Sequence, residues 1–103
     1  MQFLYVLHLV PRLRSQSAWT DADHQAVADH FQRLKVATEA GTVILAGRTA
    51  EPLNKSFGLV IFEATDEEAA RKFMESDPTV AAGVMTATLH PYSVALLRKQ
   101  HGS

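Results

Sequence analysis

The chain has 103 residues, of which 47% are hydrophobic and 20% are charged, and its formal net charge is −1. This length predicts a single domain over residues 1–103. A nearly neutral chain without a basic cluster argues against binding to nucleic acid or to an anionic membrane. The absence of cysteine excludes a disulfide framework, a zinc–thiolate site and a thiol nucleophile, and it suits a cytoplasmic protein.

The first part of the chain predicts a strand followed by a long helix. Residues 2–10 are apolar on both alternating faces and carry no charge, which is typical of a strand buried on both faces. Thr20 and Asp23 have the spacing of a capping box, so we expect a helix over residues 21–40, ended by Gly41. The residues at helical spacing that should face the core are Val27, His30, Phe31, Leu34 and Thr38.

The middle of the chain predicts two more strands and a second helix. Residues 42–47 and 57–63 form the strands, and the latter is again apolar on both faces. Thr65 and Glu68 resemble a capping box for a helix over residues 66–76. The buried stripe of that helix should consist of Ala69, Ala70, Phe73 and Met74.

An acid–proline pair predicts a break after the second helix. The helix must end near Asp77, because Pro78 is costly inside a helix and favours extended geometry at the preceding residue. Pro78 suits the first position of a second, short helical turn. Asp77 would then be held at a junction between two helical pieces. Residues 84–97 predict a fourth strand, interrupted by Pro91.

The order of these elements predicts an α+β fold. It is that of a ferredoxin-like βαββαβ plait, a four-stranded antiparallel sheet with two helices on one face. The first and third strands lie at the centre of this plait, and the fourth lies at an edge, where Pro91 is tolerated. Both central strands are apolar on both faces, so the uncovered face of the sheet needs a second layer. A second copy of the chain is its simplest source, and we therefore expect a homodimer with packed sheets.

His30 and Asp77 are the first candidate site. The two helices of a plait are adjacent and antiparallel, so these side chains can meet. A carboxylate that accepts a hydrogen bond from one imidazole nitrogen fixes the tautomer and raises the basicity of the other nitrogen. The alternative is a buried histidine whose ring is satisfied by an acid at a helix end. Spacing alone leaves both interpretations open.

Other polar residues suggest weaker candidate sites. No pair of histidines has a recognised ligand spacing, so we expect neither a metal nor a cofactor; the histidines considered are His8, His24, His30 and His90. Arg48, after the second strand, suits contact with an anionic substrate or a solvated surface position. A polar row on the last strand either lines a substrate pocket or faces water, and it consists of Thr86, Thr88, His90 and Tyr92.

Several motifs together resemble the YciI-like (YCII-related) family of small plait proteins, over about residues 24–96. They begin with a helix histidine eleven residues before Gly41, followed by LAG at residues 45–47. The most specific is the run SDPTVAAGV over residues 76–84, and the last is His90–Pro91–Tyr92. The connection between the second and third strands is shorter than in enteric members, which often carry lysine in place of His90.

The resemblance implies a dimeric α/β barrel with a His–Asp dyad in a cleft, here His30 and Asp77. One family member is a dehydrochlorinase acting on a chlorinated hydroxyhydroquinone, and muconolactone isomerases share the wider architecture. We therefore expect a cofactor-independent acid–base enzyme acting on a small, cyclic, oxygenated molecule, as a lyase, isomerase or dehydrochlorinase. The alternatives are a non-catalytic small-molecule-binding or accessory domain and a cofactor-free monooxygenase.

Overall fold

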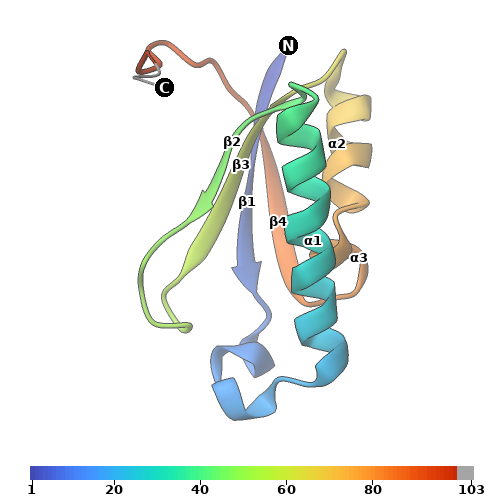
Figure 1. Cartoon of the computed structure of the whole chain (residues 1–103), viewed down its shortest axis with the longest axis vertical. Coiled ribbons are helices and arrows are strands. Elements are labelled where there is room, and N and C mark those ends of the chain that lie inside the picture. Colours follow the sequence, from blue (N-terminus) through green and yellow to red (C-terminus); the bar gives the residue numbers. More distant parts are fainter. Residues whose placement is uncertain (100–103) are drawn as a thin grey trace.

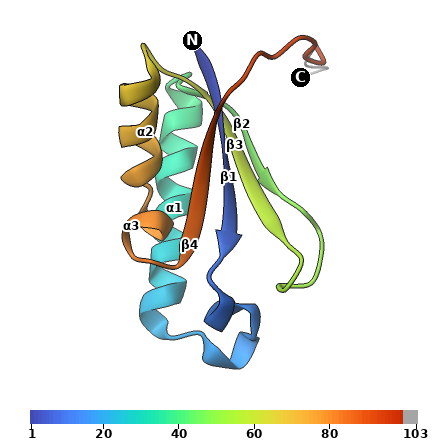
Figure 2. The same cartoon turned by 180° about the vertical axis from the view of Figure 1, so that it is seen from behind.

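A computed structural model describes residues 1–99 of the chain as an antiparallel sheet with helices on one face (Figures 1 and 2). In chain order the elements are β1 (Gln2–Leu9), the 3-10 helices η1 (Pro11–Arg14) and η2 (Gln16–Ala18), α1 (Asp21–Glu39), β2 (Val43–Arg48), β3 (Phe57–Glu63), α2 (Glu67–Glu75), α3 (Pro78–Ala81) and β4 (Met85–Pro91). The strand order is β2–β3–β1–β4, with β1 and β3 central and β4 at an edge, which confirms the ferredoxin-like plait. Within this part of the chain no helix is long and apolar enough to cross a membrane.

Alternation along β1 decides which side chains reach the core. Phe3, Tyr5 and Leu7 are buried on the face that the helices cover. They pack in one cluster with buried residues of β2, β3, α1 and α2. Full burial of a side chain of this size stabilises the fold by about 1.5–3 kcal/mol. The hydrophobic effect therefore fixes the face of the sheet on which the Tyr5 hydroxyl lies.

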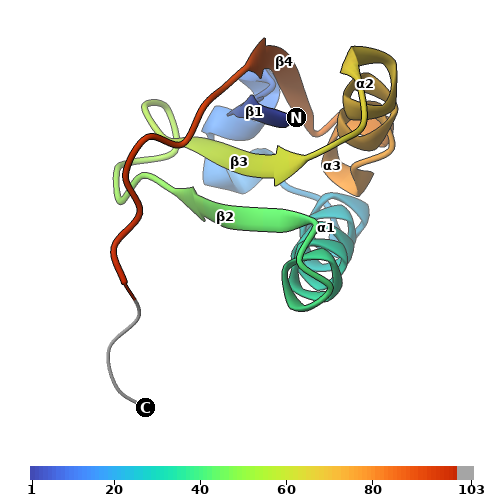
Figure 3. The same ribbon diagram turned by 90° about the horizontal axis from the view of Figure 1, so that it is seen from above.

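The other face of the two central strands is apolar as well. Leu4 and Val6 of β1 pair with Ile61 and Leu59 of β3, and all four are half-buried. Figure 3 shows α1, α2 and α3 on one side of the sheet and no helix on the other. The expected apolar character of both faces is therefore confirmed, and within residues 1–99 no α-helix covers one of them.

The predicted core stripe of α1 is partly wrong. Leu34 is buried and His30 is mostly buried, as expected, but Phe31 is 67% exposed and Thr38 is exposed too. Both residues line a cavity between α1 and β2, so they lie to the side of the helix stripe that packs on the sheet. Helical spacing identifies the stripe only to within about one residue, because it does not give the angle at which the helix meets the sheet.

Side-chain caps begin both long helices. Thr20 and Asp23 form the predicted capping box, with the Thr20 amide donating to Asp23 Oδ2 at 2.9 Å. The predicted box of Thr65 and Glu68 is wrong, because Asp66 is the N-cap of α2 and accepts from the third helical amide at 2.8 Å. The N-cap is thus Asp66, one residue after the predicted Thr65, and aspartate is at least as favourable as threonine at an N-cap.

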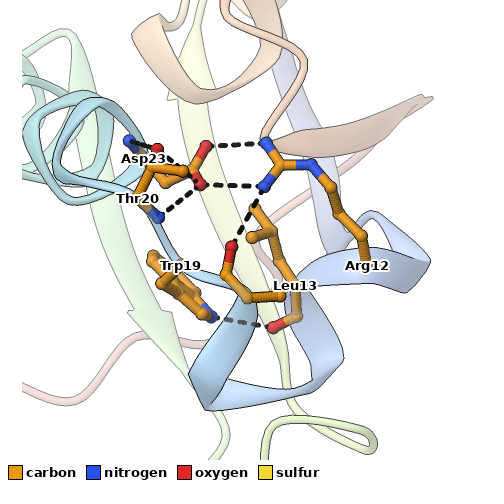
Figure 4. A network of polar contacts seen from close by, with 6 residues as sticks. Arg12, Leu13, Trp19, Thr20 and Asp23 are labelled. Carbon is orange, nitrogen blue, oxygen red and sulfur yellow. Dashed lines mark hydrogen bonds and ion pairs between the residues drawn. The ribbon is translucent and has the colours of Figure 1, made fainter.

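The connection from β1 to α1 is held by the same Asp23 carboxylate (Figure 4). Asp23 is 4% exposed, and Arg12 Nη1 and Nη2 donate to its two oxygens at 2.9 and 2.8 Å. The hydrogen bond from Arg12, with that from the Thr20 amide, holds the pKa of Asp23 well below its usual range. Trp19 Nε1 donates to the carbonyl of Leu13 at 2.9 Å, so the indole is fixed beside the start of α1.

β4 is shorter than the predicted strand over residues 84–97, since it ends at Pro91. Proline has no N–H to continue a ladder and is tolerated at the edge of a sheet. Beyond it, the Tyr92 amide donates to the Gln2 carbonyl at 3.1 Å and the Val94 amide to Gln2 Oε1 at 2.8 Å. These residues remain attached to the start of β1 without forming a strand.

Candidate functional site

Asp77 lies at the predicted break between α2 and α3. α2 ends at Glu75, and Pro78 occupies the first helical positions of α3 as expected. Asp77 is the N-cap of α3, and its Oδ1 accepts from the Thr79 amide at 3.0 Å and from Thr79 Oγ1 at 2.8 Å. Its own amide donates to the Met74 carbonyl at 3.1 Å. The backbone on both sides therefore fixes the direction of this carboxylate.

The Asp77 side chain is fully buried and joins three elements. His30 of α1 places Nδ1 at 2.7 Å from Oδ1 and 2.8 Å from Oδ2. Tyr5 of β1 donates its hydroxyl to Oδ2 at 2.6 Å. The contact expected between His30 and Asp77 is thus present, and the carboxylate has partners on both oxygens.

Tyr5 is the contact that the sequence analysis missed. Its strand reads as apolar on both faces, and a tyrosine there resembles any other aromatic core residue. The available signal was the phenol itself, because a buried tyrosine hydroxyl usually has a hydrogen-bond partner. That rule predicts some acceptor near Tyr5, although it does not identify Asp77.

The hydrogen bonds decide the charge states around Asp77. Burial raises the pKa of Asp77, but hydrogen bonds from His30 and Tyr5 outweigh it and lower the pKa to about 2. Burial raises the pKa of Tyr5 far above its usual value, and the hydrogen bond to Asp77 adds to this. At neutral pH Asp77 is a carboxylate that only accepts, so His30 Nδ1 must carry a hydrogen. In the neutral ring the lone pair is therefore on Nε2.

The His30 ring lies between Asp77 and a large cavity. Its side chain is 16% exposed and lines a cavity of about 1080 Å³ between α1 and the sheet. Leu7, Leu9 and Val60 are among the apolar residues of the sheet that line this space. Within residues 1–99 the only hydrogen bonds of the His30 ring are those of Nδ1 to Asp77. Nε2 is therefore the nitrogen available to a molecule in the cavity.

Arg33 holds the other side of the junction. Its guanidinium lies 4.2 Å from the centre of the Phe73 ring, and Nη2 donates to Ser76 Oγ at 2.8 Å. The C-terminal end of α2 carries a partial negative charge, so the helix dipole stabilises this guanidinium. The contact ties α1 to α2 one turn away from His30, which helps to hold His30 and Asp77 at a fixed separation.

The other predicted substrate contacts fall in two places. Arg48 lines the same cavity as His30. Thr86 and Thr88 alternate with the core-facing residues of β4, and Thr88 pairs with Val6 on the face of the sheet that the helices leave open. His90 shares that face, with Nε2 3.2 Å from Thr88 Oγ1, and Tyr92 follows β4 and is 42% exposed. The structure therefore separates this row from the His30 side of the sheet.

The histidines of the described chain are scattered over different surfaces. His8 packs against Phe57, with ring centres 5.8 Å apart, and His24 stacks on Trp19 at 5.0 Å. Over residues 1–99 there is no group of three or more histidine, cysteine, aspartate or glutamate side chains placed to hold a metal ion.

Comparison with known proteins supports the resemblance seen in the sequence. The model of the YCII-related domain matches residues 1–89, so the chain belongs to the YCII-related family. No curated protein matches the sequence. A similar solved structure is 5-chloro-2-hydroxyhydroquinone dehydrochlorinase (TftG) from Burkholderia phenoliruptrix AC1100, in complex with 2,5-dihydroxybenzoquinone. It has a TM-score of 0.60 and 16% identity, and the match covers 90% of this chain and 94% of that chain, which shows a shared fold.

The Asp77 carboxylate makes the free energy of unfolding depend on pH in the acid range. Its folded pKa of about 2 lies below the ordinary value of 3.8. The carboxylate therefore contributes stability that is complete above about pH 4 and is lost as pH falls towards 2. The shift corresponds to about 2 kcal/mol. We expect Asp77→Asn to lower the free energy of unfolding less at pH 2 than at pH 6, measured by urea denaturation. An equal loss at both pH values would contradict this assignment.

Tyr5→Phe tests the hydrogen bond to Asp77 while keeping the aromatic packing. Hydrogen bonds to charged groups contribute about 1.5–3 kcal/mol, so we expect a loss of stability of this size. Tyr92→Phe is the matched control, because this tyrosine is 42% exposed, and it should change the free energy of unfolding by less than about 0.5 kcal/mol. If Tyr5→Phe lowers the free energy of unfolding as little as the control does, the hydroxyl of Tyr5 contributes nothing to stability.

Proposed function

We propose that this YCII-related protein is a cofactor-independent acid–base enzyme in which His30 Nε2 removes a proton from a small, oxygenated ring compound. The observation that carries the proposal is the pair of short contacts from His30 Nδ1 to the buried, anionic Asp77. They hold the ring in one tautomer, with the basic nitrogen available to the cavity. Asp77 then orients the imidazole and stabilises the imidazolium that forms.

The proposed step balances protons and electrons without a redox centre. In the keto tautomer of the hydroxylated ring, Nε2 takes a proton from a carbon next to a carbonyl group. The electrons of the broken C–H bond form a new C=C bond, and the π electrons of the carbonyl group move to its oxygen to give an enolate. In a lyase reaction a leaving group departs with its bonding electrons, as chloride does in dehydrochlorination. In an isomerase reaction the proton returns from Nε2 to another carbon. Arg48 lines the cavity and would attract an anionic substrate.

The choice of a ring compound has support from the structural neighbour. TftG is named as a dehydrochlorinase of 5-chloro-2-hydroxyhydroquinone, and its structure holds 2,5-dihydroxybenzoquinone. At 16% identity this likeness supports the class of compound to test first, while the reaction of this chain rests on His30 and Asp77.

A non-catalytic binding domain is the second candidate. The observation that favours it is the apolar lining of a cavity of about 1080 Å³, which suits retention of a small molecule as well as its conversion. In that case the only role of Asp77 is to accept the hydrogen bond from the mostly buried His30 ring. Binding without turnover of any compound tested would support this function.

We also propose that two copies of the chain pack through their open sheet faces. Leu4, Val6, Leu59 and Ile61 form a half-buried apolar strip on the central strands, and contiguous apolar surface often marks an interface between proteins. Homodimer interfaces are more apolar than the interfaces of transient complexes, so an apolar strip of this kind suits a homodimer interface.

Val6→Lys should disrupt the proposed dimer, because it places a charge in the middle of the strip. Val36→Lys is the control, since this valine is 57% exposed on α1, on the other side of the sheet. Light scattering at micromolar concentration should give a dimer mass for the parent protein and Val36→Lys, and a monomer mass for Val6→Lys. A monomer mass for the parent protein would remove the proposal.

Activity should depend on both members of the pair. Release of chloride from 5-chloro-2-hydroxyhydroquinone and other chlorinated hydroxyhydroquinones is the first assay. His30→Gln and Asp77→Asn should each lower the rate by roughly two to four orders of magnitude, the usual effect of a general acid–base group. Lys72→Gln, at an exposed position of α2 outside the cavity and the open sheet face, should leave it unchanged. Turnover that survives in folded His30→Gln would contradict the catalytic role.

A further inference from the structure

The cavity beside His30 is elongated along α1. The α1 residues that line it recur at intervals of three or four positions from His24 to Glu39. These positions span about 22 Å of helix at 1.5 Å per residue. The volume of about 1080 Å³ is thus spread along a groove between α1 and the strands β2 and β3, with His30 near its middle.

One half of this groove ends in a rigid aromatic wall. Trp19 lines it, with Nε1 fixed on the Leu13 carbonyl at 2.9 Å and the indole stacked on His24 at 5.0 Å and 29°. Along α1 the lining residues between His24 and His30 are the apolar Val27 and Ala28, and Leu9 of β1 also lines the groove. A flat, apolar ring system suits such a surface, because it buries area on both sides without ordering a flexible side chain.

The charged side chains of the groove favour a ligand with negative charge. Lys35 and Arg48 line it together with one acidic residue, Glu39. A hydroxyquinone is acidic and satisfies this preference. Ligand sites of about 300–1,000 Å³ already accommodate drug-sized molecules, and this groove has a volume of about 1080 Å³. A compound with a single ring beside His30 would therefore leave the wall at Trp19 uncovered.

We propose that the ligand of this groove is an acidic hydroxyquinone, or a related hydroxylated aromatic compound, with two or more fused rings. Its hydroxyquinone ring lies beside His30, and its other rings extend along the first half of α1 to Trp19. This inference rests on the proposed function for the role of His30, and it names the substrate class of the same site.

A series of ligands with increasing ring number tests the proposal by binding alone. The probes are 2,5-dihydroxybenzoquinone, 2-hydroxy-1,4-naphthoquinone and 2-hydroxy-1,4-anthraquinone, with affinity measured by calorimetry. We expect about fivefold or more tighter binding for each added ring, because each ring buries tens of Å² of further apolar surface. Trp19 is the only tryptophan, so its indole N–H signal in NMR spectra identifies the site, and it should move with the larger probes.

Two substitutions on exposed positions of α1 locate the rings. Ala28 lines the Trp19 half of the groove, and Thr38 lines the other half. Ala28→Phe should abolish the gain in affinity from the added rings, whereas Thr38→Phe should preserve it. Affinity that stays constant or falls with ring number would overturn the proposal, as would equal effects of the two variants.

The outcome separates this inference from the proposed catalysis. Folded His30→Gln should keep the preference for more rings while losing turnover. If the preference holds and the parent protein turns over none of the probes or chlorinated compounds, the ring site stands and the acid–base function fails. If compounds with one ring are converted and no preference for larger probes exists, the acid–base function stands and this inference fails.

Discussion

The burial of one carboxylate determines how the helices and the sheet of this protein meet. An unpaired charge in the Asp77 position would be strongly destabilising, because a buried ion loses its hydration. Hydrogen bonds from Tyr5, His30 and Thr79 replace that hydration, and they come from β1, α1 and α3. The positions of these elements therefore depend on one another. The contact that makes the charge tolerable also sets the tautomer of His30, so that stability and the proposed chemistry have a common physical cause.

The fold and the central pair of the site follow from local patterns. The apolar runs and the caps specify the order of elements, and the Asp77–Pro78 break identifies a carboxylate with a fixed direction. Once the plait is assumed, the two helices must be neighbours, so His30 is a natural partner. The contact at 2.7 Å agrees with this reasoning, which needs only helix geometry and the behaviour of proline.

What the patterns did not reveal depends on angles between elements. Phe31 has the spacing of a core residue and yet is 67% exposed, because it lines the open groove beside α1 and does not pack on the sheet. Tyr5 lies 72 positions from Asp77, a pairing that no local rule connects. Thr88 and His90 could be assigned to a strand face but not to the side of the sheet away from His30. Periodicity specifies faces within an element, whereas tertiary packing decides what each face meets.

The separation of the residues that meet at Asp77 has a consequence for folding. Tyr5 and Asp77 are 72 positions apart and His30 and Asp77 are 47 apart, so closing both loops costs chain entropy before any of these hydrogen bonds can form. Nascent or locally opened states, in which the first strand has not docked, leave the carboxylate without the phenol. States in which α1 has not packed beside α3 lack the contact between His30 and Asp77 as well. The reactive arrangement is thus a property of the cooperatively folded chain, and a protein that exposes its apolar strips during folding lacks the proposed base at the same time.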